Sequence, residues 1–234
     1  MRERIVAGQI YHVLNRGVDK RKIFLEKSDY MRFIHDLFEF NDTESVVNLT
    51  YRFTRTTRVV DTNNFKISEQ HKRKLLVEIL AFCAMPNHYH LLLKARTVEG
   101  IPEFMKKLNM GYSKYFNTKY ERSGTLFEGR YKSVPVGSEA HFIHLPFYIH
   151  LNPLDLVMRE WRQRDIKNYK EAMKFLEKYR WSSFLDYIGK KNFPSVTNRD
   201  LLLKFFGGTE EYKKSTVEWL KQQNIEKIMG LTLE

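Results

Sequence analysis

The first regular pattern along the chain is an alternation of side chains over residues 9–15, which predicts a β-strand. Strand side chains point alternately to opposite faces, so Tyr11 and Val13 should share one face and His12 the other. Apolar residues then recur at helical spacing over 28–40, which predicts a helix with one buried face.

Five further elements follow in the pattern. They are a strand over 75–85, a strand over 88–94, a helix over 101–120, a strand-like run over 125–136 and a helix over 138–152. Ser138 should cap the last helix and Pro153 should end it. The order strand, helix, strand, strand, helix, strand, helix is typical of an α+β fold. It predicts a ferredoxin-like split βαβ core, an antiparallel sheet with helices on one face.

Two stretches fall outside this core. Periodicity fails over 41–74, a segment rich in Thr, Asn and Arg, and a solvated insertion is favoured there over a dedicated binding arm. Beyond Pro153 the chain is charged and helical, with a final pair of helices over about 198–206 and 210–223. The domain prediction is therefore a core domain over 1–155 and a helical C-terminal extension over 156–234.

Composition indicates a folded protein with a polyanionic partner. The 234 residues are 42% hydrophobic and 14% aromatic, which suits a globular chain with a full core. The net charge is +12, and the pI is about 9.6. Nucleic acid is the first partner that such a charge suggests.

The sequence lacks the features of several classes of protein. Glycine-rich loops that cradle phosphates are missing, so no nucleotide cofactor is expected. Cys83 is the single cysteine, which excludes an internal disulfide and a multi-cysteine zinc site, and a buried thiol is expected. No apolar run reaches membrane-spanning length and no secretory h-region is present, so a cytoplasmic protein without membrane association is predicted.

The candidate chemistry lies in two segments. His88 and His90 open a strand and share one face, where a cation could sit between their imidazoles. Tyr148 and Asn152 lie one helical turn apart, so a phenol that attacks phosphate could stand beside an amide oxygen that helps to hold the cation. Pro146 would cost that helix about 3 kcal/mol unless the helix begins or kinks there.

Five motifs stand in order over about residues 8–188, namely YHVLNRG (11–17), MPNHYHLLL (85–93), GTLFEGRYKS (124–133), YIHLNP (148–153) and YRWSS (179–183). They resemble those of the REP-associated tyrosine transposases, relatives of the single-tyrosine transposases of the smallest bacterial insertion sequences. The second and fourth are the most specific.

The resemblance implies a His-hydrophobe-His nuclease on a ferredoxin-like fold, with a transposase-like nuclease domain over 1–155. Such proteins bind single-stranded DNA beside a hairpin and cleave it with one tyrosine. They keep a 5′-phosphotyrosine link and release a 3′-OH. By motif, Tyr148 would be the nucleophile, and His88, His90 and Asn152 would bind Mg²⁺ or Mn²⁺. A monomer and a homodimer are both compatible with the family.

Basic residues near glycine turns or on the helix expected to face the site are the candidate contacts to DNA phosphates. They are Arg16, Lys20, Arg21, Lys106, Lys107, Arg130 and Lys132. Tyr112 and Tyr115 are alternative nucleophiles, although their apolar helix face favours burial. His12 is expected to have a structural role or to support the site.

Two other functions remain open at this stage. The first is a catalytically silent DNA- or RNA-binding regulator on the same fold. The second is an RNA-processing protein whose histidines act as acid and base without a metal.

Overall fold

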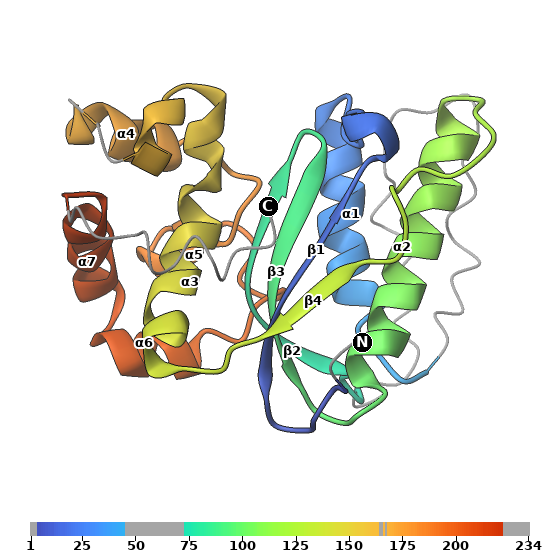
Figure 1. Ribbon diagram of the computed structural model, residues 1–234, viewed down its shortest axis with the longest axis horizontal. Helices are drawn as coiled ribbons and strands as arrows, with labels where there is room; N and C mark the ends of the chain where they lie inside the picture. The colour runs from blue at the N-terminus through green and yellow to red at the C-terminus, as the bar shows by residue number, and fades with distance from the viewer. Residues whose placement is uncertain (1–3, 45–72, 164–165, 167, 222–234) are drawn as a thin grey trace, which may run out of the picture.

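The computed structural model describes residues 4–44, 73–163, 166 and 168–221 of the chain. Its sheet consists of β1 (Ile10–Arg16), β2 (Val77–Met85), β3 (His88–Ala95) and β4 (Lys132–Pro135). The strands lie in the order β2-β3-β1-β4, and every neighbouring pair is antiparallel (Figure 1). This is the order of a ferredoxin-like split βαβ core, so the predicted α+β fold class is confirmed.

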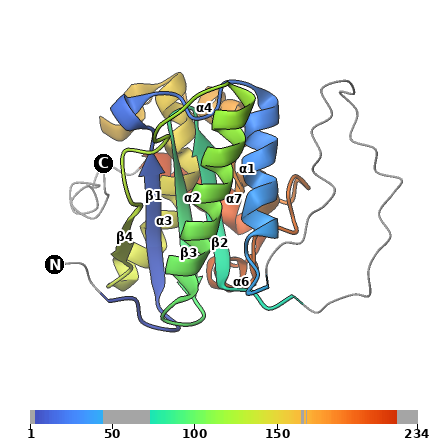
Figure 2. The ribbon, with the colours of Figure 1, turned by 90° about the vertical axis from the view of Figure 1, so that its right-hand side faces the viewer.

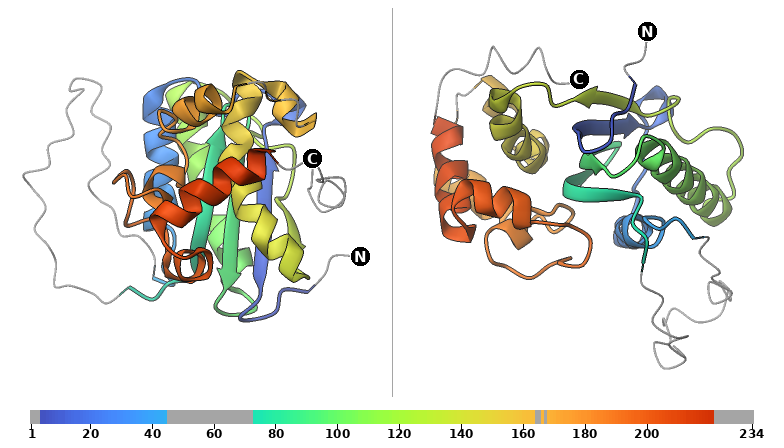
Figure 3. Two further views of the ribbon diagram at one scale, coloured as in Figure 1. Left: turned by 90° about the vertical axis from the view of Figure 1, so that its left-hand side faces the viewer. Right: turned by 90° about the horizontal axis from the view of Figure 1, so that it is seen from below.

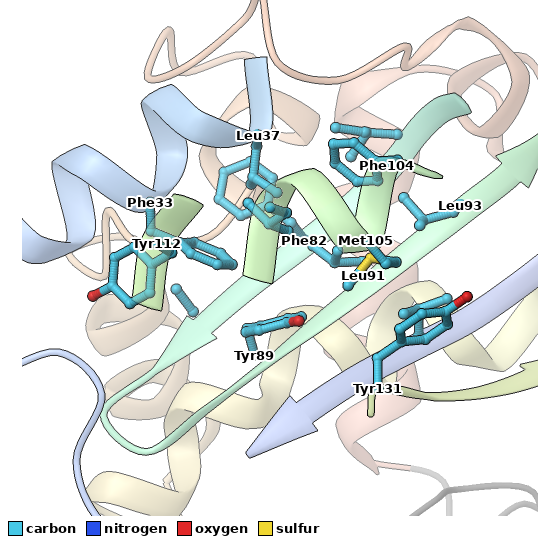
Figure 4. Close-up of a cluster of buried hydrophobic side chains, with 14 of the residues drawn as sticks. Phe33, Leu37, Phe82, Tyr89, Leu91, Leu93, Phe104, Met105, Tyr112 and Tyr131 are labelled. Atoms are coloured by element: carbon cyan, nitrogen blue, oxygen red, sulfur yellow. The ribbon is translucent and has the colours of Figure 1, made fainter. Parts of the chain in front are cut away.

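Two helices cover one face of the sheet, α1 (Lys27–Glu39) and α2 (Gly100–Lys119) (Figure 2). A capping box between Glu26 and Asp29 begins α1, one residue before the predicted start. The core below the helices is rich in aromatic side chains, among them Phe33, Tyr89 and Tyr112 (Figure 4). Apolar residues at helical spacing on α1 and α2 and at alternate positions on β1 and β3 form this core.

A second set of helices covers the opposite face, which the sequence pattern did not predict (Figure 3). It comprises α3 (Glu139–Leu151), the 3₁₀ segments η3 (Asn152–Leu156) and η4 (Arg159–Gln163), α4 (Tyr169–Leu176), α5 (Phe184–Tyr187), α6 (Asp200–Phe206) and α7 (Thr209–Lys221). The physical reason is that β2 is apolar on both faces, so Leu80 and Cys83 need cover on this side. The proposed domain boundary near residue 155 falls inside η3.

The YRWSS motif joins this layer to the sheet through backbone contacts. Phe82 N–H donates to Ser183 Oγ at 2.9 Å, and Ala84 N–H donates to the carbonyl of Trp181 at 2.9 Å. Ser183 Oγ also lies 2.8 Å from Nε2 of His150 on α3. The motif therefore attaches the second helical layer to β2 and to α3.

Two expectations change at the level of single elements, and a third stays untested. The predicted strand over 125–136 is reduced to the four residues of β4 plus a bridge between Gly17 and Phe127. Most of the expected insertion lies outside the described residues. Pro146 lies in the interior of α3, so the alternative that the helix begins at this proline is wrong.

The N-cap of α3 allows a direct test of how firmly this helix is held. Ser138 Oγ accepts from the N–H of His141 at 3.1 Å. We expect Ser138→Ala to lower the free energy of unfolding by about 1 kcal/mol and Ser138→Asp to retain it, because only the aspartate can still accept that bond. Urea denaturation measures both variants, and equal stability of the two would contradict the capping role.

No helix among the described residues is long and apolar enough to cross a bilayer.

Candidate active site

Three histidines lie on the sheet face that α3 covers. His88 and His90 start β3, with ring centroids 4.9 Å apart, so the predicted shared face is confirmed. His12 on β1 is fully buried and stacks on His90 with centroids 5.1 Å apart. Nε2 of His12 lies 2.9 Å from Nδ1 of His90, which makes His12 the neighbour that orients that imidazole.

The orientation of His88 is set by a short hydrogen-bond chain from the turn between β2 and β3. Asn87 Nδ2 donates to the carbonyl of Lys20 at 3.3 Å, so Asn87 Oδ1 faces His88. This oxygen lies 2.7 Å from Nδ1 of His88 and can only accept, so Nδ1 carries the proton. Nε2 is then the lone-pair nitrogen, and a bond to Nδ1 from an oxygen is the usual support of a metal-binding imidazole.

Tyr148 reaches this face from α3. Its ring centroid lies 5.8 Å from that of His90 and 6.2 Å from that of His12, and 2% of the residue is exposed. The one-turn register to Asn152 survives Pro146, because the backbone N–H of Asn152 donates to the carbonyl of Tyr148. The Asn152 side chain donates to the same carbonyl at 2.8 Å. The structure therefore brings three of the four predicted site residues, His88, His90 and Tyr148, onto one face, with the fourth, Asn152, one turn along α3.

An arginine beyond the motifs completes the surroundings of Tyr148. Arg162 on η4 donates through Nη1 to the Tyr148 hydroxyl at 3.1 Å and through Nη2 to Asn152 Oδ1 at 3.1 Å. Its partner carboxylate is Asp155, at 2.6 Å from Nη2. The sequence did not reveal Arg162, because it is one of 40 basic residues and lies in no motif.

The donor set suits an open divalent-cation site. Two imidazoles share a face, and the amide oxygen of Asn152, the third predicted ligand, accepts from Arg162. Among the described residues, no group of three or more His, Cys, Asp or Glu side chains is arranged to hold a metal. A cation held by His88, His90 and Asn152 would have three protein ligands and would keep its other coordination positions open for phosphate oxygens, which suits Mg²⁺ or Mn²⁺.

A basic cavity of about 270 Å³ adjoins His88. Three predicted DNA contacts line it, Arg16, Arg130 and Lys132. Arg16 is paired with Glu128 at 3.0 Å. Positive side chains that are distant in sequence thus lie together beside His88, a proposed metal ligand. They come from β1, β4 and the loop before β4.

The other predicted contacts lie elsewhere. Lys106 borders a second hollow between α2 and the loop before β4, and this hollow shares Arg130 with the first. Lys20 and Arg21 lie on or next to the 3₁₀ segment η1 (Val18–Lys20), at the end of the sheet where Asn87 turns. Lys107 Nζ donates to the carbonyl of Asp42 at 2.6 Å, in the segment that follows α1, and is paired with Glu103 at 3.1 Å.

The two alternative nucleophiles lie on the face of the sheet opposite to the histidines. Tyr112 and Tyr115 belong to α2 and are buried in the first core. Tyr112 donates to the carbonyl of Ile23 at 2.6 Å, and burial raises the pKa of both phenols. Their expected core role is confirmed. Tyr89 and Phe127 are also core residues, in edge-to-face contact at 5.9 Å.

Residues 41–152 match the model of a protein family described as "Transposase IS200 like". Over this range the chain is similar to the IS200-like transposases. The range includes His88, His90, Tyr148 and Asn152 and ends before Arg162. The resemblance inferred from the motifs is confirmed at this level, and a role related to DNA transposition follows from it.

Among solved structures, a REP-associated tyrosine transposase bound to a REP hairpin is similar to this chain, at 13% identity and a TM-score of 0.48. The alignment covers 85% of this chain and 90% of that one. No curated protein sequence matches the chain.

Proposed function

We propose that this chain is a divalent-metal-dependent endonuclease and strand transferase that cleaves single-stranded DNA beside a hairpin through Tyr148. The observation that carries the proposal is the position of Tyr148, whose ring lies 5.8 Å from His90 on the face that also holds His88. A hydroxyl nucleophile next to two imidazoles is the arrangement that tyrosine-mediated phosphoryl transfer requires.

The chemistry would be a transesterification. Tyr148 Oη forms a bond to phosphorus as the bond from phosphorus to the 3′-oxygen breaks. The phenol proton passes through solvent to that oxygen and yields a 3′-OH and a 5′-phosphotyrosine. His88, His90 and Asn152 would hold a cation that stabilises the charge on the phosphate in the transition state.

The basic cavity supports a DNA strand as the substrate. Arg16, Arg130 and Lys132 line it beside His88, and phosphate contacts require only positive charge within reach. An overall charge of +12 favours the same partner. Hairpin specificity follows from the family resemblance, and the oligomeric state stays open between monomer and homodimer.

Cleavage of an end-labelled hairpin oligonucleotide with a single-stranded flank tests the proposal. With Mg²⁺ or Mn²⁺, we expect a protein–DNA adduct on a denaturing gel that retains the label of the 3′ fragment, together with a free 3′-OH on the other fragment. A chelator should remove both products. Cleavage that persists in the chelator would instead support metal-free acid–base chemistry.

A catalytically silent DNA-binding regulator is the second candidate. Two observations favour it: Tyr148 is only 2% exposed, and the Asn152 amide oxygen already accepts a hydrogen bond from Arg162. Tight, salt-sensitive binding of hairpin DNA without an adduct under any divalent metal would establish this alternative.

A further inference from the structure

Arg162 is the one described side chain for which the structure gives hydrogen bonds to both the proposed nucleophile and the amide one turn after it. Its Nη1 lies 3.1 Å from the Tyr148 hydroxyl, and its Nη2 lies 3.1 Å from Asn152 Oδ1. The guanidinium carbon lies 5.4 Å from the centroid of the Tyr148 ring. A planar guanidinium in this place fixes the direction of the hydroxyl lone pairs, since it can only donate.

The guanidinium is held in position from behind. Asp155 accepts from Nε at 2.8 Å and from Nη2 at 2.6 Å, a two-point contact. The indole N–H of Trp161 donates to the same carboxylate at 2.6 Å, and the Trp161 ring lies 5.1 Å from the guanidinium carbon. Arg162 therefore meets Tyr148 with most of its side-chain freedom already removed, which is the property of a preorganised catalytic donor.

We propose that Arg162 is a catalytic residue that orients the Tyr148 hydroxyl and binds the phosphate to which this oxygen becomes bonded. The proposal rests on the proposed function and deepens it. As the bond from Tyr148 Oη to phosphorus forms and the bond to the 3′-oxygen breaks, the non-bridging oxygens come within reach of the donor that now binds Oη. Arg162 does not take the phenol proton, because it stays charged. In the reverse step the same donor stabilises the departing tyrosine oxygen.

The exposed fractions of the two side chains indicate which of them an incoming phosphate meets first. The Arg162 side chain is 21% exposed, whereas Tyr148 is 2% exposed, so an incoming phosphate meets the guanidinium before the hydroxyl. Arg162 also lies beyond the part of the chain that matches the family model, which ends at Asn152. The role is therefore assigned from the contacts of this chain and not from the match.

The first test is the rate of adduct formation with saturating hairpin DNA and Mn²⁺. Arg162→Gln should lower this rate by about 100-fold to 1,000-fold, the usual effect of removing one preorganised donor. Lys204→Gln is the matched control, because it removes one exposed charge on α6, and its rate should equal that of the unmodified protein. Circular dichroism establishes that each variant is folded. If Arg162→Gln does not fold, Arg162→Lys replaces it, with an expected loss of at least tenfold because the fork is gone.

The second test needs neither cleavage nor metal. In Tyr148→Phe protein with a chelator, the affinity for a single-stranded oligonucleotide is measured against salt concentration. One lost phosphate contact should reduce the slope of log K against log [salt] by about 0.7 when Arg162→Gln is added. Lys204→Gln in the same background should leave the slope unchanged.

The two tests separate failure of this inference from failure of the proposed function. An adduct that forms at the unmodified rate in a folded Arg162 variant overturns the catalytic role and leaves the function intact. Absence of an adduct in the unmodified protein overturns the proposed function. In that case an unchanged salt slope overturns the phosphate contact as well.

Discussion

Tyr148→Phe should abolish the covalent protein–DNA adduct, with the signal falling at least about 1,000-fold, because phenylalanine has no oxygen to bond to phosphorus. DNA affinity should change by less than about threefold, since the ring packing at 6.2 Å against Trp161 is kept. Adduct formation is followed on denaturing gels and affinity by fluorescence anisotropy.

Tyr115→Phe is the matched control for that substitution. Tyr115 is one of the two alternative nucleophiles from the sequence, and it lies on α2 at the opposite face, where its hydroxyl is 3.0 Å from Asp29 Oδ1. We expect this variant to form the adduct at the unmodified rate once folding is verified. An adduct that survives in Tyr148→Phe and disappears in Tyr115→Phe would move the reaction to the other face of the sheet.

The core fold could be predicted because its signals are local. Alternation on β1 assigned His12 to the face opposite Tyr11, and helical spacing placed Tyr112 in the core. The cap at Ser138 also has a local signature, so α3 was bounded correctly. Each of these inferences depends on neighbours within about four residues, the range over which sequence patterns are informative.

The second helical layer and the surroundings of Tyr148 depend instead on long-range packing. Arg162 reaches Tyr148 only because η3 turns the chain after Asn152 and η4 brings it back over the end of α3. No periodicity encodes such a return. The apolar run of β2 is the signal that could have predicted the second layer, because this strand has no polar face to leave in water.

Pro146 shows the same limit in a single residue. Propensity predicts that proline begins, bends or breaks a helix, yet α3 continues from Glu139 to Leu151 around it. The surrounding segment is almost wholly buried, and its packing against β2 and α7 outweighs one missing backbone hydrogen bond. The register between Tyr148 and Asn152 is therefore a result of tertiary structure.

The metal assignment makes the second large prediction. His88→Ala and His90→Ala should each lower both Mn²⁺ affinity and the rate of cleavage by more than about 100-fold, because either substitution removes an imidazole ligand. Affinity is measured by titrating Mn²⁺ into Tyr148→Phe protein bound to hairpin DNA, so that no turnover disturbs the equilibrium. His35→Ala, on α1 with a contact to Glu39, is the control and should change neither quantity.

Substitution of Asn87 should cause an intermediate loss of metal affinity. It binds Nδ1 of His88 at 2.7 Å without being a proposed ligand, so Asn87→Ala should cost about 10-fold to 100-fold in metal affinity by releasing the ring. The expected order of losses is thus His88→Ala above Asn87→Ala above His35→Ala. If His88→Ala binds Mn²⁺ as tightly as the unmodified sequence, the imidazole pair is not the metal site. Tyr148 would then have to work with the positive charge of Arg162 and the basic cavity alone.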